Sequence, residues 1–159
     1  MKRYQIFISS TFEDLKEERS VVAENILKLD HIPAGMELFV ASTDEQFNYI
    51  KRVIDDSDYY VLIVGNRYGS MDSSGVSYTE KEYDYAISIG LPVLVFLHGD
   101  PNSLSVKKSE SDPKIVQKLH DFRDKVKKNR MVSFWDSIQS LTNEVYASLD
   151  KAFKLTPRL

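Results

Sequence analysis

The stretch 78–86, with the sequence Tyr-Thr-Glu-Lys-Glu-Tyr-Asp-Tyr-Ala, gathers acidic and aromatic side chains at the start of a predicted helix. A carboxylate held there could act on a ligand bound beside the helix. Glu82 and Glu80 are the two candidate acids. Both acids also have a structural interpretation, because each follows a hydroxyl residue, Thr79 or Ser77, by three positions, as in a capping box. The spacing leaves open which pair caps the helix and which acid faces a crevice.

A phosphate could bind at the N-terminus of the first predicted helix. The free N–H groups and the helix dipole at such a terminus favour an anion. The alternative is that the hydroxyls of Ser10 and Thr11 only cap the helix, which is the commoner role of such side chains there. The candidate binding residues of this loop are Ser9, Ser10, Thr11 and Phe12.

The loop at 65–70, Gly-Asn-Arg-Tyr-Gly-Ser, supplies the second part of the candidate site. Arg67 can neutralise a phosphate through a forked contact, and the alternative is that it pairs with a surface acid. The glycine fingerprints of the P-loop and of the dinucleotide-binding folds are absent from the sequence. The substrate-binding candidates in this part are Arg67, Tyr68 and Tyr78.

The runs 59–64 and 92–97 are apolar on successive residues, which indicates strands buried on both faces of a parallel sheet. Around them, strand and helix patterns alternate strictly along the chain. This alternation predicts an α/β, flavodoxin-like fold with a five-stranded parallel sheet in the order 2-1-3-4-5 and helices on both faces. Ligands of such sheets bind beyond the carboxyl ends of strands one and three, which is where the loops at 9–12 and 65–70 lie.

Hydrophobic periodicity and capping residues give the remaining elements. We expect further strands at 4–8, 32–38 and 131–135, and helices at 11–29 and 80–89 and beginning near 43, 113 and 136. The expected helix caps are Thr11 paired with Asp14, Ser42 or Thr43, Asp112 before Pro113, and Asp136. We interpret the segment 98–111 as a solvated connection.

Composition and charge narrow the classes of function. The 159 residues carry a net charge of -3, so the chain lacks the basic excess that nucleic-acid binding needs. It has no cysteine, and its three histidines show no metal-ligand spacing, so we expect no metal site. No apolar stretch reaches the ~18 residues of a membrane span. We therefore expect a cytoplasmic domain without a nucleic-acid or membrane partner.

Several motifs together resemble the TIR-like family catalogued as domain of unknown function 4062. The matching runs are 7–15 (Phe-Ile-Ser-Ser-Thr-Phe-Glu-Asp-Leu), Glu18 with Arg19, 33–39 (Pro-Ala-Gly-Met-Glu-Leu-Phe), 58–63, 67–69 and 78–83. Such domains typically begin longer, multidomain bacterial proteins of defence or signalling. The resemblance therefore implies a single TIR-like domain at 1–155, a linker starting at 156–159, and partners among the other domains of a parent protein.

The chain is also similar to TIR domains and, more distantly, to nucleoside deoxyribosyltransferases. The Trp-Cys-x-x-Glu run of catalytic TIR domains falls on 78–82, and the Glu-x-x-Tyr-Ala pattern of the deoxyribosyltransferases falls on 82–86. Both comparisons therefore imply Glu82 as the catalytic acid, with Glu80 as the second choice. In that role the carboxylate would stabilise the positive charge that develops on a ribose when an N-glycosidic bond breaks, and the ring of Tyr78 or Phe12 would stack on the base. Tyr78 and Thr79 stand in place of the Trp and Cys, which leaves open whether the TIR substrate, NAD, is kept.

These resemblances imply three alternative functions. The first is cleavage of the N-glycosidic bond of NAD or a related nucleotide, with no cofactor besides that substrate, when the parent protein self-associates through TIR-like surfaces. The second is a non-catalytic TIR-type module for protein interaction or oligomerisation. The third is a nucleoside deoxyribosyltransferase. The first observation that would distinguish these functions is whether Glu82 points into the crevice or folds back on Thr79.

Overall fold

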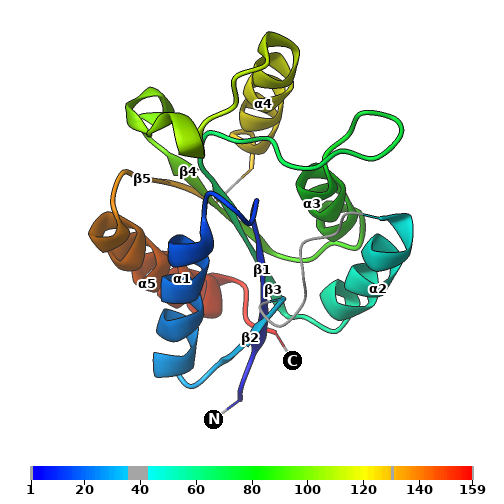
Figure 1. The fold of residues 1–159 in the computed structure, drawn as a ribbon. Helices are drawn as coiled ribbons and strands as arrows, with labels where there is room; N and C mark the ends of the chain where they lie inside the picture. The colour runs from blue at the N-terminus through cyan, green and yellow to red at the C-terminus, as the bar shows by residue number, and fades with distance from the viewer. Residues whose placement is uncertain (1, 36–42, 130, 159) are drawn as a thin grey trace.

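The computed structural model describes residues 2–35, 43–129 and 131–158, which fold around one parallel sheet (Figure 1). The sheet runs in the order β2-β1-β3-β4-β5, which confirms the predicted α/β fold and strand order. Ser9, the last residue of β1, lies beside Leu62 of β3. The strands are β1 (Gln5–Ser9), β2 (Ile32–Ala34), β3 (Tyr59–Val64), β4 (Val93–His98) and β5 (Val132–Trp135).

Helices cover both faces of the sheet in the described part of the chain. Helices α1 and α5 lie on one face, and α2, α3 and α4 lie on the other (Figure 1). Two 3-10 turns, η1 (Pro101–Ser103) and η2 (Val106–Lys108), occupy the connection after β4. The helices are α1 (Lys16–Lys28), α2 (Asp44–Asp55), α3 (Tyr78–Ser88), α4 (Pro113–Val126) and α5 (Ile138–Leu155).

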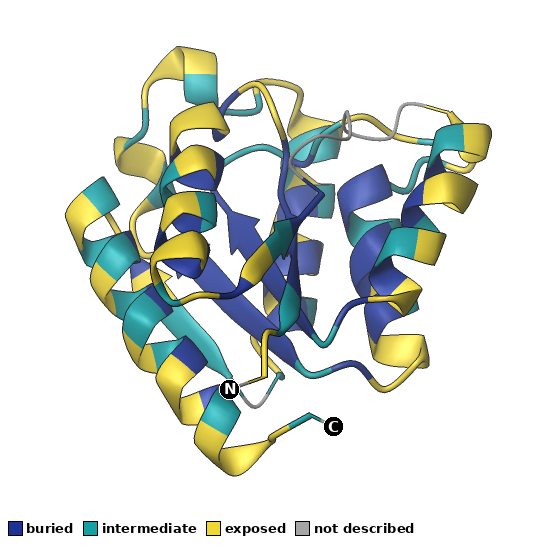
Figure 2. Ribbon diagram, turned by 90° about the horizontal axis from the view of Figure 1, so that it is seen from below, coloured by how far each residue is buried: buried dark blue, intermediate teal, exposed yellow. Residues whose placement is uncertain are grey.

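Each face of the sheet has its own hydrophobic core. All six residues of β3 are buried: Tyr60, Leu62 and Val64 pack toward α2, α3 and α4, and the other three pack toward α1 and α5. Figure 2 shows the central strands as buried and the outer surfaces of the helices as exposed. Because both faces of the central strands are apolar, polar side chains can gather only beyond the strand ends.

The predicted start of the first helix is wrong. Helix α1 begins at Lys16, and Leu15 precedes it without any side-chain cap, so Thr11 and Asp14 form no capping box. Residues 12–15 make a turn in which the Leu15 N–H donates to the Phe12 carbonyl at 3.2 Å. This turn buries Leu15 in the core next to α1 and α5. The side chains of Thr11 and Asp14 are thereby left outside the helix.

The predictions of the other helix caps are confirmed for α2 and α4 and wrong for α5. Thr43 caps α2, and Asp112 caps α4 with Pro113 in the first turn, as expected; Ser42 lies outside the described residues. Asp136 does not cap α5, because Ser137 takes that place and forms a capping box with Ser140. The expected second strand ends at Ala34, and residues 36–38 of it lie outside the described residues.

The assignment of the α5 cap predicts unequal effects of two neighbouring exposed substitutions. Ser137→Ala should lower the free energy of unfolding by about 1 kcal/mol, because the Ser140 N–H loses its acceptor. Ser137→Asp should restore most of this loss, since aspartate is also a good N-cap. Urea denaturation monitored by circular dichroism measures both. An equal or larger loss for Asp136→Ala would contradict the assignment.

Candidate functional site

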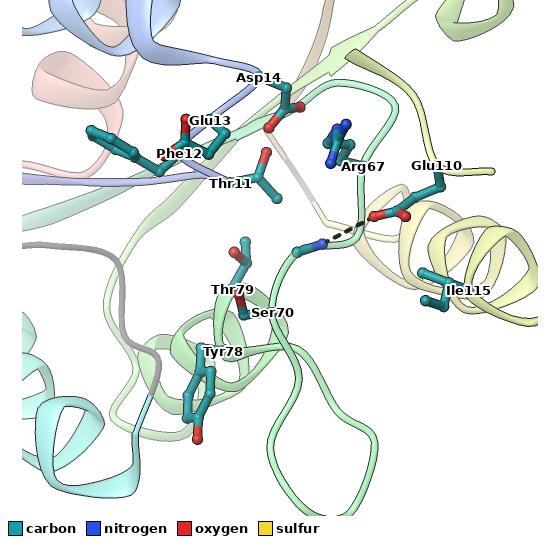
Figure 3. Close-up of a pocket in the computed structure, with 11 residues that line it drawn as sticks. Thr11, Phe12, Glu13, Asp14, Arg67, Ser70, Tyr78, Thr79, Glu110 and Ile115 are labelled. Carbon is teal, nitrogen blue, oxygen red and sulfur yellow. Dashed lines mark hydrogen bonds between the residues drawn. The ribbon is translucent and has the colours of Figure 1, made fainter. Parts of the chain in front are cut away.

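A pocket of about 560 Å³ opens at the carboxyl-end edge of the sheet, where the strand order reverses (Figure 3). The loops that follow β1 and β3, the start of α3 and the segment around the start of α4 form its walls. Four of the binding residues predicted from sequence line it: Thr11, Phe12, Arg67 and Tyr78. The described lining residues are Thr11, Phe12, Glu13, Asp14, Arg67, Gly69, Ser70, Tyr78, Thr79, Glu110 and Ile115.

Asp14 is the most unusual group in this pocket. Its side chain is only 4% exposed, yet neither carboxylate oxygen has a hydrogen-bond partner among the described residues. Burial raises the pKa of Asp14, and the nearby Thr11 hydroxyl and Arg67 guanidinium offset only part of that effect. In Figure 3 the polar ends of these three side chains lie close together at one end of the pocket.

One nitrogen of the Arg67 guanidinium already binds another part of the protein. Its Nη2 donates to the Lys107 carbonyl at 2.7 Å, which ties the loop after β3 to the connection after β4. The Nε of Arg67 is buried and has no partner within the described chain. Arg67 therefore keeps at least one N–H that could bind a ligand.

The two predicted stacking residues differ in availability. Phe12 is 39% exposed at one side of the pocket, so its ring is accessible to a base. Tyr78 is buried, its ring lies near Phe47 of α2, and its hydroxyl donates to Asp44 at 3.3 Å. Tyr78 thus packs α3 against α2 as well as lining the pocket.

The connection after β4 contributes directly to the pocket, which its interpretation as a solvated connection did not include. Glu110 lines the pocket, and its carboxylate accepts hydrogen bonds from the N–H groups of Tyr68 at 2.9 Å and Gly69 at 3.5 Å. Gly69 adopts a φ of 94°, and a Cβ there would approach the Thr11 methyl group to 2.9 Å. Glycine at this position therefore allows the loops after β1 and β3 to meet.

Glu82 lies in a buried polar network beside the pocket and is not among its described lining residues. Its carboxylate accepts a hydrogen bond from the Ser9 hydroxyl at 2.8 Å. The buried Arg19 of α1 donates to the Ser10 hydroxyl at 2.9 Å and to the Gly35 carbonyl at 3.1 Å. Serine hydroxyls of β1 and of the residue after it thus connect both ionisable groups to the strand end.

Burial determines the protonation of this network. It raises the pKa of Glu82 to about 7, although the Ser9 hydrogen bond and the positive charge of Arg19 both act in the opposite direction. The buried Tyr60 hydroxyl lies close enough for the Glu82 charge to affect it, and burial raises the pKa of Tyr60 well above its ordinary value. Glu82 therefore changes charge near neutral pH.

The position of the helix cap gives the two acids of α3, Glu80 and Glu82, different roles. Ser77 is the N-cap and accepts from the Glu80 N–H at 3.1 Å, so Thr79 and Glu82 form no capping box. The Glu80 carboxylate instead binds the Tyr68 hydroxyl at 2.6 Å and Lys125 of α4 at 2.8 Å. Glu80 and Tyr68 thus link α3, α4 and the loop after β3, and neither lines the described pocket.

The catalytic role of Glu82 and the binding roles of Ser9, Ser10 and Tyr68 remain predictions. Ser9 and Ser10 are buried in the polar network, and the Ser10 hydroxyl donates to the Thr11 carbonyl. Since α1 begins at Lys16, the N–H groups of residues 10–12 do not belong to the first turn of a helix. That observation removes the helix dipole from the argument for a phosphate at this loop.

Asp14, Arg19 and Glu110 belong to the site but were not predicted from the sequence. Arg19 had a detectable signal, because it falls on the apolar helical stripe that includes Leu15 and Val22. A charged residue on such a stripe must find a buried partner. Asp14 was interpreted as part of a cap, and Glu110 belongs to a polar segment in which nothing distinguishes it.

Within the described residues, no group of three or more His, Cys, Asp and Glu side chains is arranged to hold a metal ion. None of the described helices combines the length and the hydropathy needed to cross a membrane.

Residues 5–150 match the family model described as Domain of unknown function (DUF4062). The chain belongs to this family. No curated protein matches the DUF4062 chain in sequence.

Two solved structures are similar to the DUF4062 chain. Over 94% of its length it resembles translation elongation factor SelB from Methanococcus maripaludis in complex with the GTP analogue GppNHp, with 11% identity and a TM-score of 0.53. The alignment covers 34% of that chain, so the DUF4062 chain spans about a third of it. The TIR domains of the activated Roq1 resistosome align over 92% of this chain and 84% of theirs, with 12% identity and a TM-score of 0.46. The likeness to SelB shows the fold alone.

The raised pKa of Glu82 predicts a pH-dependent difference in stability between the wild-type domain and Glu82→Gln. The folded protein keeps the Glu82 proton up to about pH 7, whereas the unfolded chain loses it near pH 4.5. The contribution of this group to stability is therefore complete below about pH 4.5 and is lost as the pH rises through about 7. Relative to Glu82→Gln, the wild type should lose up to roughly 1.4 kcal/mol per pH unit in this window.

Urea denaturation of both proteins at several pH values between these limits measures the difference. All other titrating groups are common to the two chains, and the amide oxygen of the substituted side chain would still offer an acceptor to the Ser9 hydroxyl. Stability curves that stay parallel across the window would show that Glu82 titrates at its ordinary pKa.

Proposed function

We propose that this DUF4062 domain is a TIR-like nucleotide-processing module that cleaves the N-glycosidic bond of NAD or a related nucleotide. The observation that carries the proposal is a buried carboxylate, Glu82, whose pKa is raised to about 7 at the sheet edge where such folds bind ligands. Thr79, which lines the pocket, lies one helical turn before Glu82 on α3. The acid and the pocket are therefore neighbours.

Glu82 has properties that suit N-glycosidic bond cleavage. As the bond to the base breaks, positive charge develops on the ribose, and an ionised carboxylate stabilises that charge. The Ser9 hydroxyl holds one carboxylate oxygen, and the Arg19 charge favours the ionised form. The Ser9 hydrogen bond orients the carboxylate before the substrate binds. The bond breaks with its electron pair passing to the base, which leaves; water then adds to the ribose carbon and loses a proton to the carboxylate.

The pocket has the size and the groups to take a nucleotide. Its volume of about 560 Å³ falls within the usual range for small-molecule sites. The exposed ring of Phe12 supports base stacking, and the free Nε of Arg67 supports a contact with a phosphate. In this proposal the nucleotide is the substrate and no separate cofactor takes part. The biological setting that the resemblance implies is bacterial defence or signalling.

A second candidate function is a non-catalytic interaction module. It is favoured by the same polar network, because Glu82 is only 5% exposed and already hydrogen-bonded to Ser9, as a purely structural acid would be. Folds of this class host many functions, so the architecture does not decide between the two. The deoxyribosyltransferase alternative has no observation of its own in its favour.

The proposal predicts that Glu82→Gln lowers turnover of NAD by about 100-fold or more, the scale seen when one preorganised electrostatic group is removed. Turnover of the wild-type domain should rise with pH through about 7, as Glu82 ionises. Mass spectrometry of NAD, its phosphorylated form and nucleosides incubated with the domain, up to millimolar protein to drive self-association, detects the released base.

The matched control is Glu80→Gln, which removes an acid two residues away that is bound to Lys125 and Tyr68. It should leave turnover within a few-fold of wild type while lowering thermal stability. No release of base from any of these substrates, or equal turnover by Glu82→Gln and wild type, would eliminate the catalytic function and favour the interaction module.

A further inference from the structure

The unpaired Asp14 carboxylate is a group that the folded chain by itself does not explain. A buried carboxylate normally has hydrogen-bond donors or a charge partner, because removing it from water is costly. Asp14 lines the pocket at 4% exposure and has neither oxygen paired within the described residues. A ligand that enters the pocket with hydrogen-bond donors would supply what is missing.

The neighbours of Asp14 define which chemical groups would fit. The Thr11 hydroxyl can donate and accept, is buried, and has no partner in the described part of the chain. The Arg67 Nε can only donate and is equally unpartnered. Asp14, Thr11 and Arg67 therefore place a hydrogen-bond acceptor, a hydroxyl that both donates and accepts, and a donor close together, as Figure 3 shows.

Charge excludes an anionic group from direct contact with Asp14. Glu13 and Glu110 also line the pocket, so three acids face one arginine. A phosphate against Asp14 would meet like charge at short range. A divalent cation is also disfavoured, since no cluster of three ligating side chains occurs within the described residues. The remaining fit is a neutral group whose atoms both donate and accept hydrogen bonds.

We propose that Asp14 and Thr11 bind the 2′,3′-cis-diol of a ribose. Adjacent hydroxyls of a cis-diol can both donate to one carboxylate, and one of them can still accept a hydrogen bond from Thr11. The proposal rests on the proposed function in that the same pocket takes the nucleotide, but it requires binding only. It commits the domain to ribosides and therefore argues against the deoxyribosyltransferase alternative.

Sugar discrimination is the direct test. Methyl β-D-ribofuranoside should shift the amide signals of Thr11, Asp14 and Gly69 in NMR titrations of the domain, and its 2-deoxy analogue should bind about tenfold more weakly or less. A site built to hydrogen-bond a hydroxyl rejects the analogue that lacks it, because its own polar group is then left unpaired. Adenosine and 2′-deoxyadenosine form a second pair of probes that adds the base.

Asp14→Asn tests the residue itself. The amide keeps the shape but offers one acceptor in place of two, so affinity for methyl β-D-ribofuranoside and for adenosine should fall about tenfold or more. The matched control is Glu17→Gln, which removes an exposed acid in the first turn of α1 that is not among the described residues lining the pocket. It should change affinity less than twofold.

Thermal stability separates binding from a structural role. Because Thr11 and Arg67 offset only part of the cost of burying the Asp14 charge, Asp14→Asn should raise the melting temperature at pH 7 while it weakens binding. A lower melting temperature with unchanged sugar affinity would overturn the proposal and make Asp14 a structural residue. Equal binding of the ribose and deoxyribose probes, or no shift with either, would overturn it as well.

The outcomes distinguish this inference from the proposed function. Ribose binding that depends on Asp14, without release of any base, leaves the inference standing and removes the catalytic proposal. Base release by a domain that binds both sugars equally would overturn the inference and leave the proposed function standing.

Discussion

Burial of the central strands on both faces is the constraint on which the rest of this domain depends. Every residue of β3 and β4 is buried, and the side chains of β3 divide between two hydrophobic cores. A sheet of this kind has no position along its middle where an ionisable group could meet water. Polar chemistry is therefore confined to the strand ends, and the reversal of strand order opens space at one of them.

The charged groups at that edge are unusually deeply buried. Arg19 and Glu82 reach the end of β1 from helices on opposite faces of the sheet, and the hydroxyls of Ser9 and Ser10 bind them there. Opposite charges joined through hydroxyls offset part of the cost of burial. For Asp14, the nearby Thr11 hydroxyl and Arg67 charge offset only part of the cost of burial. A buried acid that is compensated only in part lowers stability, which is the pattern expected where a group is kept for a ligand.

The pocket walls are held together by contacts between distant segments. Glu110 binds the backbone of the loop after β3, and Arg67 from that loop binds the Lys107 carbonyl in return. Glu80 connects α3 to α4 through Lys125. These contacts position the loops around the cavity without occupying the unpaired groups of Thr11 and Asp14.

The sequence by itself determined the sheet and the edge at which a site could form. Short runs of consecutive apolar residues rich in Val, Ile and Leu indicate buried strands, and strict alternation with helices limits the strand order to very few solutions. Local spacing was less reliable for the acids. Thr11 with Asp14, and Thr79 with Glu82, both have capping spacing, yet neither pair caps a helix.

Only the tertiary structure decided what these side chains do. The cap of α3 is at Ser77, and the burial of Leu15 moves the start of α1 beyond Asp14. The partner of Glu82 is Ser9, which is 73 positions away in the chain. Local patterns report neighbours three or four residues apart, whereas this contact depends on how β1 pairs with β3 and how α3 packs on the sheet. The protonation of Glu82 and the isolation of Asp14 follow from burial, which no short stretch of sequence encodes.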